Sequence, residues 1–340
     1  MRTPVLPTTI IGSLPKPAWL TSEWYTVTEK WNLSGDSLQE ALDDATRLAL
    51  ADQDAAGIDI VCDGGQRRPT HYSYFLTQLG GVDLKEMKAK AMRGGKFTQN
   101  VPRVVGPLTL QNHRAVQDYL FLKRLTPKPI KMTLPGPSTL VDGTYDDHYG
   151  DERALALAYA RVLNEEIKAL ELAGCEMVQI DEPSFTRLPR KVHDYGVDAI
   201  DATFAGTRVK SCVHICYGYR ARIGDKEWKH GYEEIFPALV RSKADQFSLE
   251  LAEPNLAPKI LSMLPGKTIQ AGVVEVGSLN VETPETVADR LRGVLEVVPS
   301  EHVIAAPDCG CVALSRDVAR AKMQSLVLGA AIVRAQIARR

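Results

Sequence analysis

The sequence lacks a long hydrophobic run. Its first residues, 1–7, contain no apolar segment like that of a secretory signal, and no stretch reaches the roughly 18 uninterrupted apolar residues of a membrane span. Cysteine is scarce as well, with six in 340 residues. Without a secretory signal, we expect these six to be free or metal-bound thiols in a reducing compartment, and the protein to be cytoplasmic.

An excess of charge of either sign is also missing. The chain has 41 Lys and Arg against 42 Asp and Glu, which gives a formal net charge of -1. Neither nucleic acid nor a membrane is therefore expected as a partner. No glycine-rich phosphate-binding pattern of the G-x-G-x-x-G or P-loop kind follows a predicted strand, so nucleotide binding has no support in the sequence.

The chain does have ample core-forming material, with 44% apolar and 24% charged residues. Short apolar runs predict strands at 8–13, 58–62, 129–134, 176–180, 209–215, 246–249, 268–276 and 303–306. Helical spacing of apolar residues is clearest at 34–58, 151–174, 284–298 and 318–338. This alternation predicts an α/β fold, a (β/α)8 TIM barrel that forms a single domain over 1–340, with an open doubly wound sheet as the alternative. The section between the loop 63–68 and residue 129 is expected to be irregular, and its basic stretch 85–96 to be solvated surface.

A histidine and a cysteine stand two residues apart in one predicted strand. On a β-strand, His214 and Cys216 point to the same face. An imidazole and a thiolate side by side make half of a tetrahedral zinc site. A buried core strand that happens to contain both residues is the alternative, because Cys is among the most buried residue types.

Two further metal-ligating residues lie at the ends of other predicted strands. Glu250 follows the strand at 246–249, and Cys309 follows the strand at 303–306. Active sites of (β/α)8 barrels lie at the C-terminal ends of the strands, so His214, Cys216, Glu250 and Cys309 are predicted to converge on one rim. Structural zinc sites usually take closely spaced ligand pairs. Ligands from three separate strand ends therefore favour a catalytic metal centre.

This set of ligands suggests a particular chemistry. Two thiolates and a carboxylate make the metal electron-rich and a poor activator of water, whereas a thiol that coordinates a metal is deprotonated. A substrate thiol at such a site would be a thiolate at neutral pH and a good nucleophile toward an alkyl carbon. The ligands thus predict alkylation of a thiol.

With these residues the chain resembles the cobalamin-independent methionine synthase family, specifically its catalytic C-terminal barrel. The resemblance covers nearly the whole chain and rests, in order, on Ile11-Gly12-Ser13, Gln179-Ile180-Asp181-Glu182-Pro183, His214-Ile215-Cys216, Ser248-Leu249-Glu250 and Pro307-Asp308-Cys309-Gly310. It implies a cytoplasmic, Zn2+-dependent methyltransferase that methylates homocysteine to methionine. The implied zinc ligands are His214, Cys216, Glu250 and Cys309. The implied binding residues for the amino-acid part of homocysteine are Ile11, Gly12, Ser13 and Asp181.

The sequence departs from the family pattern in three ways. The N-terminal barrel that helps full-length members to hold folate has no counterpart, so the chain resembles the short core branch, in which methylcobalamin or a corrinoid protein could replace methyl-folate as donor. Gly65 stands where the family has a Glu that contacts the substrate ammonium. Gly277 stands where full-length members have a catalytic His, so the role of proton donor has no evident owner.

These departures keep two other functions open. One is an alkyltransferase that joins another thiol, such as coenzyme M, to an epoxide or a similar alkyl donor, because such a thiol has no ammonium group. The other is a non-catalytic, zinc-stabilised barrel that binds a small ligand. Arg67 and Arg68 could hold a carboxylate or sulfonate by bidentate hydrogen bonds, or could simply pair with acids at the protein surface.

Overall fold

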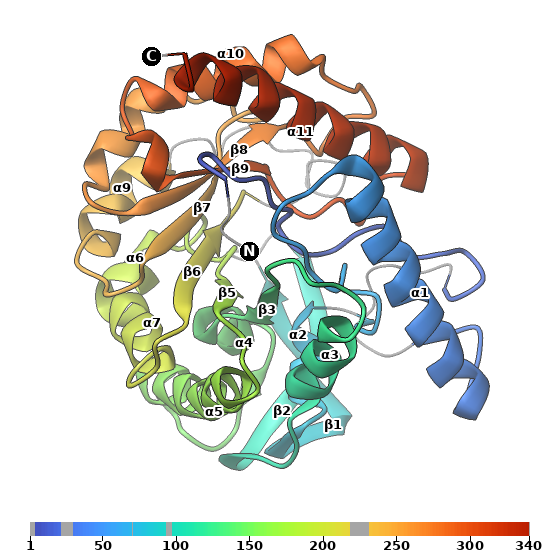
Figure 1. Cartoon of the computed structure of the whole chain (residues 1–340). Coiled ribbons are helices and arrows are strands. Elements are labelled where there is room, and N and C mark those ends of the chain that lie inside the picture. Colours follow the sequence, from blue (N-terminus) through green and yellow to red (C-terminus); the bar gives the residue numbers. More distant parts are fainter. Residues whose placement is uncertain (1–3, 22–29, 70, 93–96, 218–230, 340) are drawn as a thin grey trace.

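A ring of parallel strands forms the centre of the molecule (Figure 1). The computed structural model describes residues 4–21, 30–69, 71–92, 97–217 and 231–339. Six strands form one parallel sheet in the order of the chain: β3 (Lys131–Pro135), β5 (Met177–Asp181), β6 (Lys210–Ile215), β7 (Gln246–Glu250), β8 (Thr268–Val274) and β9 (Val303–Pro307). Two short segments close the ring, because Thr8 pairs with Ala305, Thr9 with Ile60, and Val61 with Ile130. The predicted (β/α)8 barrel is confirmed.

The first two predicted strands are reduced to single parallel bridges. At 58–62 the side chain of Asp59 takes over part of the pairing, since its Oδ2 accepts hydrogen bonds from the backbone N and the Oγ1 of Thr8, both at 2.8 Å. The Oγ1 of Thr9 donates to the carbonyl of Ile60 at 2.9 Å. Side chains therefore join the N-terminal segment to the barrel where a regular ladder of backbone bonds does not form.

Helices surround the ring of strands on its outer side (Figure 1). The longer ones are α1 (Gly35–Ala56), α3 (Arg114–Lys123), α5 (Glu152–Leu172), α9 (Gly231–Leu239), α10 (Pro284–Leu295) and α11 (Arg316–Ile337). Shorter ones are α2 (His71–Leu76), α4 (Pro137–Asp142), α6 (Pro189–Lys191), η1 (Val192–Gly196), α7 (Val197–Thr203), η2 (Pro258–Met263) and η3 (Ser300–His302). Local sequence sets several helix ends: Asp151 and Ser315 cap the N-termini of α5 and α11, and Gly57 ends α1 with a φ of 84°. Within the described ranges, no helix is both long and apolar enough to cross a membrane.

A second sheet, which contains both antiparallel and parallel pairing, lies outside the barrel. Strands β1 (Leu79–Met92) and β2 (Phe97–Leu110) pair with each other, and β4 (Tyr145–Asp146) pairs with β2. The prediction of an irregular section before residue 129 is therefore wrong for these strands; residues 93–96 lie outside the described ranges. Charged side chains of both strands hold Asp147, which lies 3.1 Å from Lys88 Nζ and 2.7 Å from Arg103 Nε. The basic residues thus stabilise a hairpin at the surface.

Candidate metal centre

Three of the four predicted ligands meet at the C-terminal end of the barrel. His214 lies near the end of β6, Cys216 follows that strand, and Cys309 follows β9. Their ligand atoms all lie within 4.8 Å of one another, and all three side chains are buried. The strands β6 and β9, which carry these residues, are not neighbours in the sheet. The closure of the strands into a ring therefore brings the three residues together. One imidazole and two thiols at this spacing could hold a metal ion.

Glu250 ends β7, the strand beside β6, but it is not part of this group of three. Its Oε2 accepts a hydrogen bond from the backbone N of Tyr217 at 2.8 Å. Its Oε1 is buried and has no hydrogen-bond partner in the described part of the chain. Burial, and next the charge of Cys216, raise the pKa of the Glu250 carboxyl well above its ordinary value. A cation beside Oε1 would give this oxygen a partner and would stabilise the negative charge of the buried carboxylate.

The imidazole of His214 is held by one of its nitrogens only. Nδ1 lies 3.1 Å from the hydroxyl of Ser248 on β7, whereas Nε2 is buried without a partner among the described residues. An unpaired buried polar atom costs about 1–3 kcal/mol. Metal-ligating histidines commonly have one ring nitrogen fixed by a hydrogen bond and the other on the metal. The environment of His214 therefore fits a metal ligand.

The thiols of this group differ from the other cysteines of the chain. A hydrogen bond between Cys309 and Cys216 lowers the pKa of the Cys216 thiol well below its ordinary value and raises that of Cys309. Burial, by contrast, raises the pKa of Cys62, Cys212 and Cys311 to about 12 in each case. Since the thiolate is the form that binds metals, the lowered pKa of Cys216 suits this thiol to a metal ion. Cys309 is suited by its position, because it lies in the same group of three.

A buried carboxylate joins the two strand ends that carry Glu250 and Cys309. Asp308 is fully buried and accepts hydrogen bonds from the backbone N of Leu251 and Ala252, both at 3.0 Å, and from that of Glu253 at 2.6 Å. Its own backbone N donates to the carbonyl of Val274 on β8 at 2.9 Å. Asp308 thus fixes the loop after β7 against the residue that precedes Cys309. For Asp308, no role is predicted from the sequence beyond its place in the Pro-Asp-Cys-Gly motif.

The predicted substrate-binding residues lie beside this centre. Asp181, at the end of β5, is paired in register with His214 on β6. Gln179, for which no role of its own is predicted from the sequence, donates from Nε2 to the carbonyl of Ile11 at 2.8 Å and to Oδ1 of Asp181 at 2.7 Å. The thiol of Cys62 donates to the carbonyl of Gly12 at 3.2 Å. The loop 11–13 and Asp181 are therefore neighbours on the rim, next to the candidate metal ligands.

The backbone at Gly65 disfavours the glutamate that the family pattern has there. Its φ is 63°, and a Cβ added to it would lie 3.0 Å from Oγ of Ser13 and 3.4 Å from Nη2 of Arg68. A side chain at this position would be strained by the left-handed backbone and would crowd Ser13. The left-handed backbone at position 65 thus goes together with the absence of a glutamate there. Asp181 is a carboxylate that does lie near the loop 11–13.

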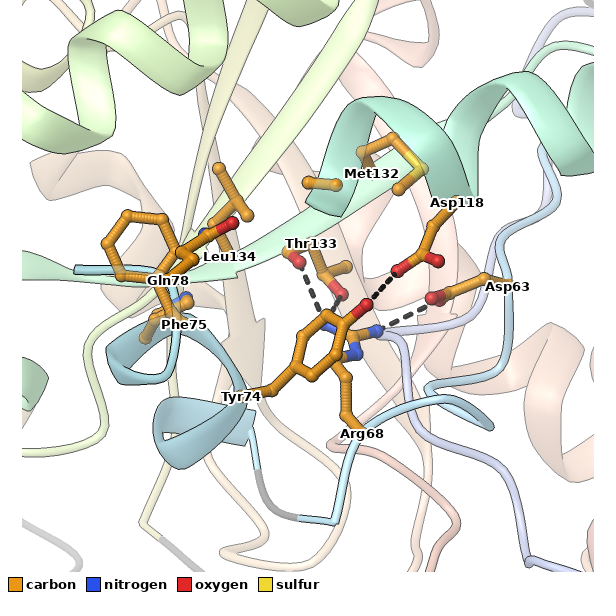
Figure 2. Close-up of a pocket in the computed structure, with 11 residues that line it drawn as sticks. Asp63, Arg68, Tyr74, Phe75, Gln78, Asp118, Met132, Thr133 and Leu134 are labelled. Carbon is orange, nitrogen blue, oxygen red and sulfur yellow. Dashed lines mark hydrogen bonds and ion pairs between the residues drawn. The ribbon is translucent and has the colours of Figure 1, made fainter. Parts of the chain in front are cut away.

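Arg67 and Arg68 both pair with acidic residues of the protein. Arg68 binds Oδ1 of Asp63 at 2.9 Å and donates to O and Oγ1 of Thr133 at 2.8 and 2.9 Å, as Figure 2 shows. Arg67 pairs with Asp43 and, at 3.4 Å, with Asp118. Both guanidinium groups are buried. They pair with acids, as one of the two predicted roles has it, but these acids are buried or half-buried, so the prediction that they lie at the surface is wrong.

Comparison with known proteins identifies a family and several relatives that the chain resembles over nearly its whole length. Residues 6–331 match the family described as cobalamin-independent synthase, catalytic domain. Methionine synthases from Sulfurisphaera tokodaii and Thermococcus kodakarensis are 32% and 33% identical to the chain, over 98% and 100% of it and over 94% and 96% of their own lengths. The solved structure of a B12-independent methionine synthase from Shewanella sp. W3-18-1, in complex with selenomethionine, superposes with a TM-score of 0.94 at 39% identity and covers 99% of this chain and 100% of that one. The chain belongs to the cobalamin-independent methionine synthase family.

Proposed function

We propose that this protein is a zinc-dependent methyltransferase that transfers a methyl group to the thiol of homocysteine and so forms methionine. The observation that carries the proposal is the meeting of His214, Cys216 and Cys309 on the rim. The register pairing of Asp181 with His214 also supports the proposal, because the Asp181 carboxylate could bind the ammonium group of an amino acid. The complex of the Shewanella structure supports the choice of substrate, because selenomethionine is methionine with selenium in place of sulfur.

The residues present fit a zinc ion. We assign His214 Nε2, the two thiolates of Cys216 and Cys309, and Glu250 Oε1 as its ligands. The two unpartnered buried atoms, His214 Nε2 and Glu250 Oε1, support this assignment. One nitrogen, two sulfurs and one oxygen are a donor set that Zn2+ accepts in tetrahedral geometry. When bound, the ion would lower the pKa of a substrate thiol, which is the chemistry that methylation at sulfur needs.

The other rim residues would bind and orient the substrate. Asp181 is proposed to accept a hydrogen bond from the substrate ammonium, and Ile11, Gly12 and Ser13 to hold its carboxylate. Gln179 supports this arrangement, because it bonds to both Ile11 and Asp181 and so keeps the two halves of the site in register. Orienting the thiol in this way contributes to the rate by reducing the entropy lost in the transition state.

A turnover assay with defined thiols and donors tests the proposal. Protein loaded with zinc is incubated with homocysteine and, in separate arms, methylcobalamin, methyl-folate, and methylcobalamin with a corrinoid-binding protein; methionine is measured by mass spectrometry. We expect methionine in at least one arm and none without zinc. Coenzyme M with an epoxide is the competing arm. Product in that arm alone would favour the alkyltransferase, which the left-handed Gly65 and its missing ammonium-binding carboxylate also allow.

A further inference from the structure

A cavity lies between the loop that follows β7, the short helix η2 and the helix α10. It has a volume of about 480 Å³ and opens to solvent, and Val273 of β8 lies at its base. η2 has six residues and α10 has twelve, which correspond to lengths of roughly 12 and 18 Å. The cavity is the space beside α10 and β8 that the short η2 does not fill.

Most of the lining of this cavity is apolar. Leu251, Val273 and Val294 line it with side chains that are otherwise buried, and Leu256 lines it with a half-buried one. Sites for small molecules commonly have volumes of about 300–1,000 Å³, an apolar lining and a few polar groups. An apolar chain in the cavity would make the dispersion contacts that its lining lacks when the space is unfilled.

Arg290 of α10 brings a positive charge to this apolar lining. Its Nη1 donates to the carbonyl of Val273 at 2.8 Å and to Oε1 of Glu282 at 3.1 Å. These bonds hold the half-buried guanidinium in place through one nitrogen. In the part of the chain that the structure describes, Nε and Nη2 have no hydrogen-bond partner. Their N–H groups can therefore donate to a ligand.

The charges around Arg290 favour an anion. Glu282 is shared between two cations, because its Oε1 pairs with Arg290 and its Oε2 lies 2.9 Å from Nζ of Lys322. Asp289 also lines the cavity, but its carboxylate pairs with Arg292 on the same helix. Among these side chains two carboxylates stand beside three cations, so a ligand with one negative charge would balance them.

We propose that this cavity is a second binding site, for a small carboxylate with an apolar chain. The carboxylate would accept hydrogen bonds from Nε and Nη2 of Arg290, and the chain would pack against Leu251 and Val273. Since the guanidinium is already fixed to the carbonyl of Val273, little freedom is lost when it binds the ligand. None of the four candidate metal ligands is among the described residues that line the cavity. The site is thus distinct from the metal centre, and the inference does not depend on methyl transfer.

Hexanoate and two analogues of similar shape test the site. Hexanamide has no charge and hexylamine has a positive one. Protein loaded with zinc and homocysteine is titrated with each compound, and the methyl signals of the protein are followed by NMR. We expect hexanoate to bind at least roughly tenfold more tightly than hexanamide, because a hydrogen bond between charged groups is lost with the amide. The shifted signals should be those of Leu251, Leu256, Val273 and Val294, whereas Ile11 beside the metal centre should not shift.

Substitution of Arg290 tests the source of this preference. Arg290→Gln should bind hexanoate and hexanamide about equally, and Arg290→Lys, which keeps the charge, should retain part of the preference. Arg320→Gln removes the same charge from α11, outside the cavity, and should match the wild type. Circular dichroism checks the folding of each variant, and if Arg290→Gln does not fold, the wild-type titrations decide. A full preference in folded Arg290→Gln, tighter binding of hexylamine than of hexanoate, or no shift of the four cavity signals would overturn the inference.

Discussion

Cys309→Ser is expected to bind less than a tenth as much zinc as the wild type, which should hold about one ion per chain. Serine keeps the size of the side chain, but its hydroxyl does not ionise at neutral pH, so the site loses one of its two thiolates. Cys216→Ser should behave in the same way, and both variants should lose the methyl transfer that we propose. Because both residues follow strand ends and take no part in strand pairing, and because serine has nearly the size of cysteine, the variants should stay folded.

Zinc content by atomic emission, with circular dichroism as the check on folding, measures this effect. Cys311→Ser is the matched control, since Cys311 is a buried thiol two residues after Cys309 that lies outside the group of three. It should keep its zinc. Full zinc content in both Cys309→Ser and Cys216→Ser would show that the ligand assignment is wrong.

Asp181→Asn is expected to raise the KM for homocysteine by about 10–150-fold. The substitution removes the charge from a hydrogen bond to the substrate ammonium, and a bond to a charged group contributes about 1.5–3 kcal/mol. The shape of the side chain is preserved, and the amide oxygen can still accept from Gln179. Zinc content should therefore stay at the wild-type level.

A substrate analogue separates this effect from a general disturbance of the site. 4-Mercaptobutanoate has the thiol and the carboxylate of homocysteine but no ammonium group, so its inhibition constant should be the same for the wild type and Asp181→Asn. An unchanged KM with full activity would mean that Asp181 does not bind the ammonium. It would then favour an acceptor thiol without an amino group.

The barrel could be predicted because each of its strands is a local pattern. Runs such as 209–215 and 246–249 are apolar, short and bounded by loops, and the structure has strands β6 and β7 there. The hairpin of β1 and β2 was missed because its strands are rich in charged residues and are interrupted by register shifts between Gly80 and Val82 and between Asp83 and Lys88, so that no regular alternation of apolar residues marks them. Taken alone, each segment of the hairpin has so many charged residues that its sequence resembles that of a solvated loop.

The convergence of His214, Cys216 and Cys309 could be predicted for a related reason. In a (β/α)8 barrel all strand ends lie on one rim, so the topology alone places residues from β6 and β9 near each other. The residues that support them could not be found in this way. Gln179 bridges 168 positions to Ile11, and Asp308 reaches back more than 50 positions to the loop after β7. Similarly, the sequence shows only that residue 277 has no side chain. That the carboxylate of Glu253 packs against Gly277 is known only from the structure.

The central claim is that a substrate thiol reaches the metal held by His214, Cys216 and Cys309. X-ray absorption at the zinc edge tests it most directly, because it counts the sulfur atoms around the ion with and without homocysteine. The account predicts two sulfurs per zinc in the free protein and three after homocysteine is added, all at about 2.3 Å. An unchanged count of two, under conditions where calorimetry shows that homocysteine is bound, would contradict it.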